Sequence, residues 1–261
     1  MAEALVQLRK VSKSYSSRAG LRQVLEDVDL NILRGERISL VGPNGSGKTT
    51  LLRIILGIDE PDSGSVSHNW SVNNREHISY VPQDYRNALF PWLRLSSNLA
   101  LSDGGKRTNP QSLTNSRDVS ADADGEYDAL AKLFRLPLDL TKYPYQLSGG
   151  EQQIFLLLRA IVSRPNLILL DEPLSAVDFG RRRLILEHLG KWIPDTNSTL
   201  VFASHDFEES VLLADRVIVM ARRSGQIKST IQIDLPWPRN LEMRSEAPFR
   251  SFVEEITRAV I

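Results

Sequence analysis

The sequence contains no cysteine, and this absence excludes disulfide bonds, thiolate metal ligands and a cysteine nucleophile. It is compatible with a reducing, cytosolic compartment. Lysine and arginine together number 32, as do aspartate and glutamate, so the formal net charge at pH 7 is zero. Because no excess of positive charge is present to attract a polyanion, we expect no nucleic-acid partner.

The sequence also lacks a long apolar run. No stretch approaches the ~18 residues that a membrane-spanning helix needs, and the first residues do not combine a basic segment with an apolar one. We therefore expect any membrane association to be peripheral. The length of 261 residues allows one large domain or two small domains. The composition, 41% hydrophobic and 25% charged, is ordinary for a globular protein with a sizeable core.

A complete phosphate loop of the form G-x-x-x-x-G-K-[ST] is present at residues 42–50. It follows a strand-like run at 37–41 and leads into a helix-like run at 49–56, as the motif requires. Its glycines let backbone N–H groups surround an anion at the positive end of the helix. We expect Lys48 to reach the β- and γ-phosphates of a nucleoside triphosphate and Thr49 to bind Mg²⁺. The predicted nucleotide contacts in the loop are Gly42, Pro43, Asn44, Gly45, Ser46, Gly47, Lys48, Thr49 and Thr50.

Two adjacent carboxylates, Asp171 and Glu172, follow an aliphatic run at residues 166–170. Packing alone does not explain two acids at the end of a buried strand. In a chain that also carries a complete phosphate loop, this acidic pair predicts two roles. Asp171 would bind Mg²⁺, and Glu172 would orient or deprotonate the attacking water.

A glycine pair lies in the segment Leu-Ser-Gly-Gly-Glu-Gln-Gln at residues 147–153, before a helical run. Ser148 is typical of a helix N-cap, and a capped helix would be a sufficient explanation. The alternative is a second anion site formed by Ser148, Gly149 and Gly150 at the positive helix end.

The expected architecture is α/β around a central sheet. The runs at 166–170 and 198–203 are typical of strands buried on both faces of a parallel sheet, and short stretches before residue 49 predict a further small sheet. Residues 102–126 are strongly polar and predict an exposed loop, because they cannot bury enough apolar surface to offset their ordering entropy.

The order of the phosphate loop, Leu-Ser-Gly-Gly, aliphatic-Asp-Glu and a later histidine resembles the ATP-binding subunit of ATP-binding cassette (ABC) transporters over roughly residues 5–221. The resemblance implies a P-loop NTPase fold of the ABC ATPase type, with a central, mainly parallel sheet, an antiparallel β subdomain and a helical subdomain. It places the nucleotide-binding domain at residues 1–235, with the helical subdomain at about 88–165 and a C-terminal extension at 236–261. It also implies a head-to-tail dimer, in which each ATP lies between one chain's phosphate loop and the other chain's Leu-Ser-Gly-Gly helix.

Matching positions imply further site residues. Tyr15 would stack on adenine, Gln83 would sense Mg²⁺ and contact the membrane subunit, and His205 would contact the γ-phosphate. Asp178 would lie in a loop that crosses the dimer interface. Each residue type alone has an ordinary structural explanation, and the spacing relative to the other motifs favours the functional one. The resemblance thus makes Glu172, His205 and Gln83 the catalytic candidates.

The chain departs from the family pattern after Leu-Ser-Gly-Gly, where the family commonly has Gln, a variable residue, Gln and Arg. This chain has Glu151, Gln152, Gln153 and Ile154, of which only Gln153 fits. Glu151 places a negative charge near the expected triphosphate and should weaken that site unless a cation compensates. Both a homodimer and a heterodimer therefore stay open.

Two segments resemble importers of nitrate, sulfonates, taurine and related small anions. Residues 82–92 carry several large apolar side chains and resemble the segment that docks the transmembrane permease, with core packing as the alternative. After residue 239, apolar residues at helical spacing predict an amphipathic helix, for which packing against its own domain is the favoured explanation.

We therefore predict the ATP-hydrolysing subunit of an importer at the cytoplasmic face of the cell membrane. Its expected cofactors are ATP and Mg²⁺, and its expected partners are a permease, a second ABC ATPase subunit and an extracytoplasmic substrate-binding protein. One alternative is a soluble ABC ATPase of translation or DNA repair, although such proteins usually carry two cassettes or a long coiled coil. The other is a regulatory subunit with little hydrolysis, which Glu151 and Ile154 keep open.

Overall fold

The aliphatic runs of the sequence form a six-stranded sheet in the order β5-β6-β7-β3-β8-β9. The computed structural model describes residues 4–17, 20–69, 78–101, 121–136, 138–222 and 225–261. Neighbouring strands are parallel, except that β9 pairs with β8 in the antiparallel sense. The strands are β3 (Arg37–Val41), β5 (Ile78–Val81), β6 (Leu167–Asp171), β7 (Thr199–Ala203), β8 (Arg216–Met220) and β9 (Ile227–Gln232).

A second, antiparallel sheet has the order β2-β1-β4. It is formed by β1 (Ala4–Ser17), β2 (Gly20–Leu33) and β4 (Ser63–His68). Near the end of β2, the buried side chains Val28, Leu30 and Ile32 alternate with exposed polar ones. This period of two is expected of a strand with one solvated face. The small sheet predicted from the first part of the sequence is this one.

Two hydrophobic clusters cover the two faces of the central sheet. Leu167 and Leu169 of β6 belong to the cluster shared with the antiparallel sheet and helix α1 (Lys48–Leu56). Ile168 and Leu170 point to the opposite face and pack among the other helices. Because both faces are buried, β6 is apolar at every position before its final aspartate.

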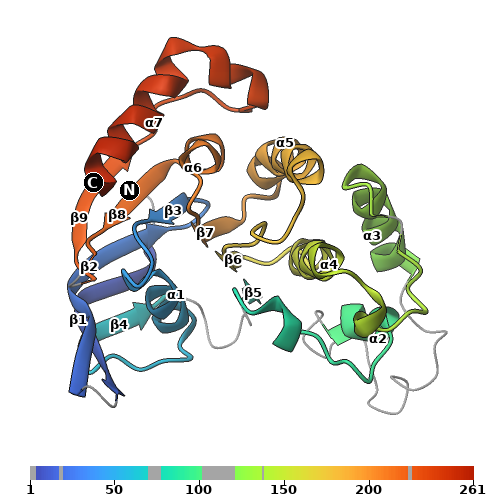
Figure 1. Cartoon of the computed structure of the whole chain (residues 1–261), viewed down its shortest axis with the longest axis horizontal. Coiled ribbons are helices and arrows are strands. Elements are labelled where there is room, and N and C mark those ends of the chain that lie inside the picture. The colour runs from blue at the N-terminus through green and yellow to red at the C-terminus, as the bar shows by residue number, and fades with distance from the viewer. Residues whose placement is uncertain (1–3, 18–19, 70–77, 102–120, 137, 223–224) are drawn as a thin grey trace.

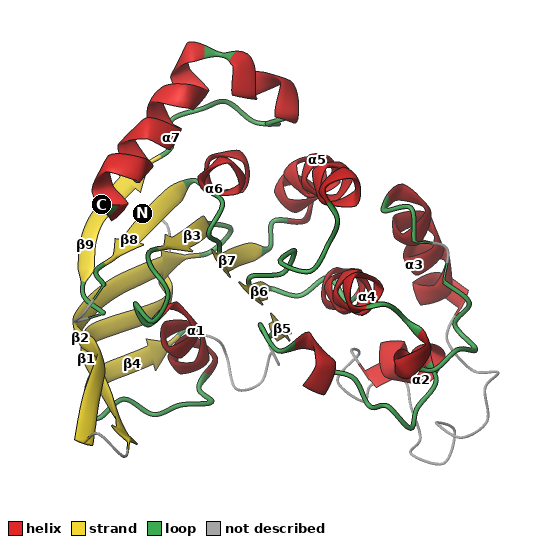
Figure 2. Cartoon of the chain, viewed as in Figure 1, coloured by secondary structure: helices red, strands yellow, loops and turns green. Residues whose placement is uncertain are grey.

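The other helices are α2 (Leu95–Ala100), α3 (Ala121–Leu133), α4 (Gly149–Val162), α5 (Phe179–Thr196), α6 (Phe207–Leu213) and α7 (Ala247–Val260). Single 3-10 turns occur at Tyr85–Asn87, Pro144–Gln146 and Leu241–Ser245. Figure 1 and Figure 2 show α2, α3 and α4 grouped on the side of the molecule away from β1, β2 and β4. The predicted α/β architecture, with its central sheet, antiparallel sheet and helical group, is confirmed.

The prediction of a loop at residues 102–126 is wrong for the last residues of that range. Residues 102–120 lie outside the described residues, but α3 begins at Ala121. Its second half carries Tyr127, Leu130 and Ala131, which are buried. A helix nucleated by such a packed segment extends at low cost into neighbouring residues that have little apolar surface of their own. Polar composition alone therefore misplaced the start of this helix.

The amphipathic helix predicted near the end of the chain is α7. Phe249 and Ile256 are buried, and Phe252 and Val253 pack against the same hydrophobic cluster. Contacts with α6, β8 and β9 hold this helix against its own chain, which was the favoured explanation of the pattern.

Arg239 joins the segment before α7 to the rest of the fold. Its side chain is only 1% exposed, and burial lowers its pKa to about 10. The guanidinium donates to the carbonyl oxygens of Val211 and Ala214, at the carboxyl end of α6. It also donates to the carbonyl oxygens of Ile233 and Leu235. One buried cation therefore satisfies carbonyl groups from the end of α6 and from the connection that follows β9.

We predict that Arg239→Met destabilises the protein, because methionine fills similar space but cannot donate to these carbonyl groups. The free energy of unfolding should fall by roughly 2–4 kcal/mol. Urea denaturation followed by circular dichroism measures it. Arg258→Met, at an exposed arginine on α7, is the matched control and should change stability by less than about 0.5 kcal/mol. Equal unfolding midpoints for Arg239→Met and the wild-type protein would contradict this role.

Candidate functional site

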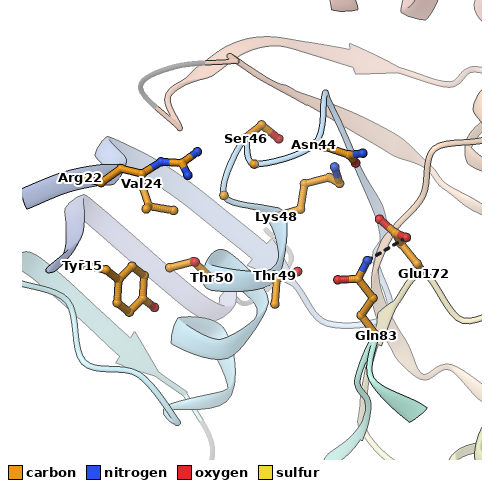
Figure 3. A pocket seen from close by; sticks show the side chains of 12 residues that line it. Tyr15, Arg22, Val24, Asn44, Ser46, Lys48, Thr49, Thr50, Gln83 and Glu172 are labelled. Atoms are coloured by element: carbon orange, nitrogen blue, oxygen red, sulfur yellow. Dashed lines mark hydrogen bonds between the residues drawn. The ribbon is translucent and has the colours of Figure 1, made fainter. Parts of the chain in front are cut away.

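The phosphate loop connects the carboxyl end of β3 to the start of α1 and forms one wall of a pocket of about 400 Å³ (Figure 3). The lining residues are Tyr15, Arg22, Val24, Asn44, Gly45, Ser46, Gly47, Lys48, Thr49, Thr50, Gln83 and Glu172. The structure thus brings most of the predicted loop contacts together with Tyr15, Gln83 and Glu172, which come from three other parts of the chain. Gly42 and Pro43 lie immediately before the lining residues.

The loop approaches β2 so closely that only glycine fits at residue 47. Gly47 has φ +95°, and a Cβ atom there would lie 2.7 Å from the carbonyl oxygen of Val24 and 2.7 Å from a methyl carbon of Leu25. Glycine permits both the backbone conformation and the close approach. The first N–H groups of α1, which have no intrahelical acceptor, are consequently available at the pocket for an anion.

Lys48 places a buried cation against the loop. Its Nζ donates to the carbonyl oxygen of Gly42 at 2.8 Å and to that of Pro43 at 3.2 Å. Burial lowers the pKa of Lys48, whereas the carboxylates of Glu172 and Asp171 act in the opposite direction. An ammonium group held beside backbone N–H groups suits a phosphate ligand.

Asp171 has the surroundings expected of a metal ligand. Both carboxylate oxygens are buried and make no hydrogen bond within the described part of the chain. Burial raises the pKa of Asp171; the nearby Thr49 hydroxyl acts in the opposite direction, although its geometry falls short of a hydrogen bond. An unpaired buried carboxylate is costly, and a bound cation removes that cost.

The donor set fits Mg²⁺ bound together with a phosphate ligand. Among the described residues, no three acidic or histidine side chains gather to hold a metal ion by themselves. Mg²⁺ typically needs only one or two carboxylates and completes its shell with substrate phosphates and water. The Asp171 carboxylate and the Thr49 hydroxyl provide protein oxygens of the required kind.

Three predicted catalytic side chains meet at the carboxyl edge of the central sheet. Gln83 follows β5, Glu172 follows β6 and His205 follows β7, and these strands are neighbours in the sheet. The Gln83 Nε2 donates to Glu172 Oε2 at 3.1 Å, as Figure 3 shows. The His205 Nε2 lies 2.5 Å from Glu172 Oε1. The Glu172 carboxylate is thus held from both sides at the end of the pocket.

The backbone at Glu172 is itself unusual. Its φ of +52° lies in the left-handed region, which costs a residue other than glycine roughly 1–2 kcal/mol. Its N–H donates to the carbonyl oxygen of Ala203 on β7 at 3.1 Å. Such a conformation persists only where the surrounding structure holds it, and functional sites are common places for it.

Tyr15 lies at the rim of the pocket, opposite Glu172 (Figure 3). Its hydroxyl donates to Asp59 Oδ2 at 2.7 Å, and Asp59 in turn accepts two hydrogen bonds from Arg53 of α1. Tyr15 as a whole is 39% exposed. This anchoring leaves a ring face available to stack on a planar ligand.

Outside the phosphate loop, five residues predicted to contact the nucleotide do not line this pocket: Ser148, Gly149, Gly150, Asp178 and His205. Ser148 is the N-cap of α4, and Asp178 is the N-cap of α5, where its side chain accepts a hydrogen bond from the Arg181 N–H. The capped helix considered for Ser148 is therefore present. An anion site there would need a ligand held by a second chain.

Glu151 closes the cap of α4. Its Oε2 accepts hydrogen bonds from the Ser148 N–H at 2.8 Å and from the Ser148 hydroxyl at 2.7 Å. The hydrogen bonds from Ser148 lower the pKa of Glu151. The Glu151 carboxylate thus occupies the Ser148 N–H and hydroxyl, the same groups that a phosphate at this helix end would contact.

Arg22 and Val24 line the pocket but were missed from the sequence. Both lie on β2, which reaches the loop because Tyr15 pairs with Arg22 across the β1/β2 hairpin. The Arg22 guanidinium would contact a Cβ placed at Gly45, at 3.0 Å. No motif contains these residues, and only a hairpin register drawn outward from Tyr15 could have identified them.

Comparison with known proteins gives concordant results. The sequence profile of the family described as ABC transporter matches residues 25–175. An Fe(3+) ions import ATP-binding protein of Pectobacterium atrosepticum is 37% identical, covering 93% of this chain and 66% of the relative. An aliphatic sulfonates import ATP-binding protein of Bacillus cereus is 31% identical, covering 95% of this chain and 94% of the relative.

The fold matches solved structures as well. A dimeric ATP-binding cassette, MJ0796, in a post-hydrolysis state bound to ADP and Pi, aligns with a TM-score of 0.71 and 27% identity. The alignment covers 88% of this chain and all of that chain. The chain spans 57–66% of the length of the first curated relatives that it matches, among them ATP-binding proteins for iron, polyamine and sulfate import.

We predict that Lys48→Ala weakens the binding of a fluorescent ATP analogue by a factor of 10 to 100 or more. The variant loses a charge-assisted contact worth roughly 1.5–3 kcal/mol. Fluorescence titration measures the dissociation constant. Lys10→Ala, at an exposed lysine on β1, is the control and should bind like the wild-type protein. Unaltered affinity in Lys48→Ala would rule out a phosphate ligand at this loop.

Proposed function

The chain belongs to the ABC transporter family, and on that premise we propose that it binds MgATP in the pocket and hydrolyses it to ADP and phosphate. The observation that carries this proposal is the position of Glu172. Its carboxylate lies at the pocket wall across from the phosphate loop, held between Gln83 and His205. A carboxylate fixed beside a triphosphate can accept a proton from water.

In the proposed reaction, a water oxygen attacks the γ-phosphorus and forms the new P–O bond. The bond from that phosphorus to the bridging oxygen breaks, and its electron pair leaves with ADP. Glu172 accepts the proton of the water, while Gln83 and His205 orient its carboxylate. Bound Mg²⁺ supplies positive charge that stabilises the charge developing on the phosphate oxygens. Asp171 and Thr49 would hold it.

The nucleotide would be bound along the length of the pocket. We assign Lys48 and the loop N–H groups to the phosphates, and the exposed ring of Tyr15 to the adenine. The separation of these two features across the pocket supports this orientation (Figure 3). The Arg22 side chain, near Gly45, adds a positive charge on the phosphate side.

A second ATP-binding subunit, identical or related, would complete each site. Ser148, Gly149, Gly150 and Asp178 lie outside the pocket of their own chain, and the matched cassette MJ0796 is a dimer. In a head-to-tail arrangement, these residues would face the nucleotide of the other subunit. The helix dipole of α4 and the first N–H groups of this helix favour an anion there.

The partner in the membrane would be a permease that docks beside α2. Leu89 in the segment predicted for docking, and Leu95 and Leu99 just after it, are buried, as the core-packing alternative expects. Phe90 and Trp92 are instead 43% and 70% exposed, with ring centroids 5.4 Å apart. Exposed aromatic pairs of this kind are common at protein interfaces.

None of the helices in the described ranges is both long and apolar enough to cross a membrane.

The proposed cargo is a small anion of the nitrate, sulfonate or taurine type, taken up with the help of an extracytoplasmic substrate-binding protein. The sulfonate-import relative supports this class of cargo, because the match covers 94% of that relative's length. The subunit would act at the cytoplasmic face of the membrane.

We predict that Glu172→Gln lowers the rate of phosphate release by 100-fold or more and leaves the affinity for ATP within about twofold, because the amide cannot accept the proton. It should also favour an ATP-bound dimer, which size-exclusion chromatography detects. Glu254→Gln, at an exposed glutamate on α7, is the control. Full turnover in Glu172→Gln would show that Glu172 is not the proton acceptor. Absence of turnover in the wild-type protein would favour a regulatory subunit.

We further predict that the chain co-purifies from detergent-solubilised membranes with a multi-span protein, as mass spectrometry would identify. Trp92→Ala should reduce this recovery several-fold, because it removes an exposed aromatic contact. Ile58→Ala, at another exposed hydrophobic residue, is the control and should be recovered like the wild-type protein. Recovery only with ribosomes, DNA or soluble proteins would contradict the transport function.

A further inference from the structure

Gln153 on α4 is a fully buried polar side chain to which the proposed reaction assigns no role. Its amide nitrogen donates to the backbone carbonyl of Glu172 at 2.9 Å and to the Ser175 hydroxyl at 3.1 Å. Its amide oxygen accepts from the N–H of Ala176 at 2.7 Å. One side chain thus joins α4 to three successive points of the segment that follows β6.

The hydrogen bond from Gln153 to Glu172 reaches a residue whose backbone conformation is strained. Glu172 has φ +52°, and its N–H is bound to the carbonyl oxygen of Ala203. On the other side, its carbonyl accepts from Gln153 Nε2 and from the N–H of Ser175 at 3.2 Å. The peptide orientation at Glu172 determines the direction in which the carboxylate leaves the chain. A donor on that carbonyl therefore helps to direct the carboxylate toward Gln83 and His205.

The same amide also fixes the loop before α5 to the start of α4. Gln153 binds Ala176, and the carbonyl oxygen of Ala176 would lie only 2.9 Å from a Cβ placed at Gly150. Glycine at residue 150 therefore permits a close backbone approach between α4 and this loop. The first turn of α4, the loop and the backbone of Glu172 are consequently held as one unit.

We propose that Gln153 is a positioning residue, which keeps the Glu172 carboxylate in its reactive orientation by binding the Glu172 backbone. This inference rests on the proposed function, since it concerns the same reaction. Gln153 touches neither the pocket nor its proposed ligands. Its effect should therefore fall on the chemical step, whereas ATP binding should be preserved.

The test measures phosphate release and ATP affinity in Gln153→Met, which has a similar shape but no amide. We expect kcat to fall 10- to 100-fold, because small displacements of a catalytic group are costly, with the dissociation constant for ATP within twofold. Gln152→Met is the matched control. Gln152 also donates to backbone carbonyls, those of Pro144 and Leu147, but not to Glu172. Its kcat should stay within threefold of wild type.

A double-mutant comparison separates positioning from general destabilisation. If Gln153 acts through Glu172, adding Gln153→Met to Glu172→Gln should reduce single-turnover phosphate release by less than twofold. Equal losses in both backgrounds, or an unchanged kcat in Gln153→Met, would overturn the inference. If Gln153→Met does not fold, Gln153→Asn serves instead, because it keeps a polar amide at this buried position but shortens the side chain and withdraws the donor from Glu172.

The two proposals fail in different ways. Undiminished hydrolysis in Glu172→Gln alone would reject the role of Glu172 in the proposed reaction. Diminished hydrolysis in Glu172→Gln, together with an additive effect of Gln153→Met, would reject only the positioning role.

Discussion

The parallel pairing of β6, β7 and β3 is the constraint on which the site depends. Asp171 lies opposite Ala203, and Ala203 lies opposite Leu40, so these strands end at one level. The carboxyl ends of parallel strands all lie at the same edge of the sheet. Glu172, His205 and the phosphate loop therefore become neighbours although they are distant in the sequence. A one-residue slip in any pair would turn the following side chain to the other face of the sheet.

Charge at this edge is only partly balanced by the chain itself. Lys48 donates to carbonyl oxygens of its own loop, and the carboxylate of Asp171 is buried with no hydrogen bond from the described residues. Glu172, by contrast, is held by Gln83 and His205. A metal-bound triphosphate would bring phosphate oxygens to Lys48 and a cation to Asp171. The proposed ligand thus complements the charge of Lys48, which lines the pocket, and that of Asp171, which ends β6.

Two buried polar side chains show how such a site is kept in place. Gln153 binds the backbone beside the pocket, and Arg239 binds backbone carbonyls at the far end of α6. The guanidinium carbons of Arg37 and Arg239 lie over the ring of Trp237, 4.0 and 4.2 Å from the ring centroid. Both buried groups satisfy backbone groups that would otherwise lose their hydrogen bonds on burial. The helices are thereby tied to the sheet by directional contacts as well as by apolar packing.

The phosphate loop with its strand and helix, and the acidic pair after β6, were predictable from the sequence alone, because these patterns depend on residues adjacent in the chain. The sequence alone did not predict that Arg22 lines the pocket, that α3 begins at Ala121 or that Gln153 binds the backbone of Glu172. Those features arise from tertiary contacts. The β1/β2 hairpin, the packed face of α3 and the docking of α4 each join residues that no local spacing relates. Local chemistry therefore specified the elements, and the pairing of strands and helices specified which side chains meet.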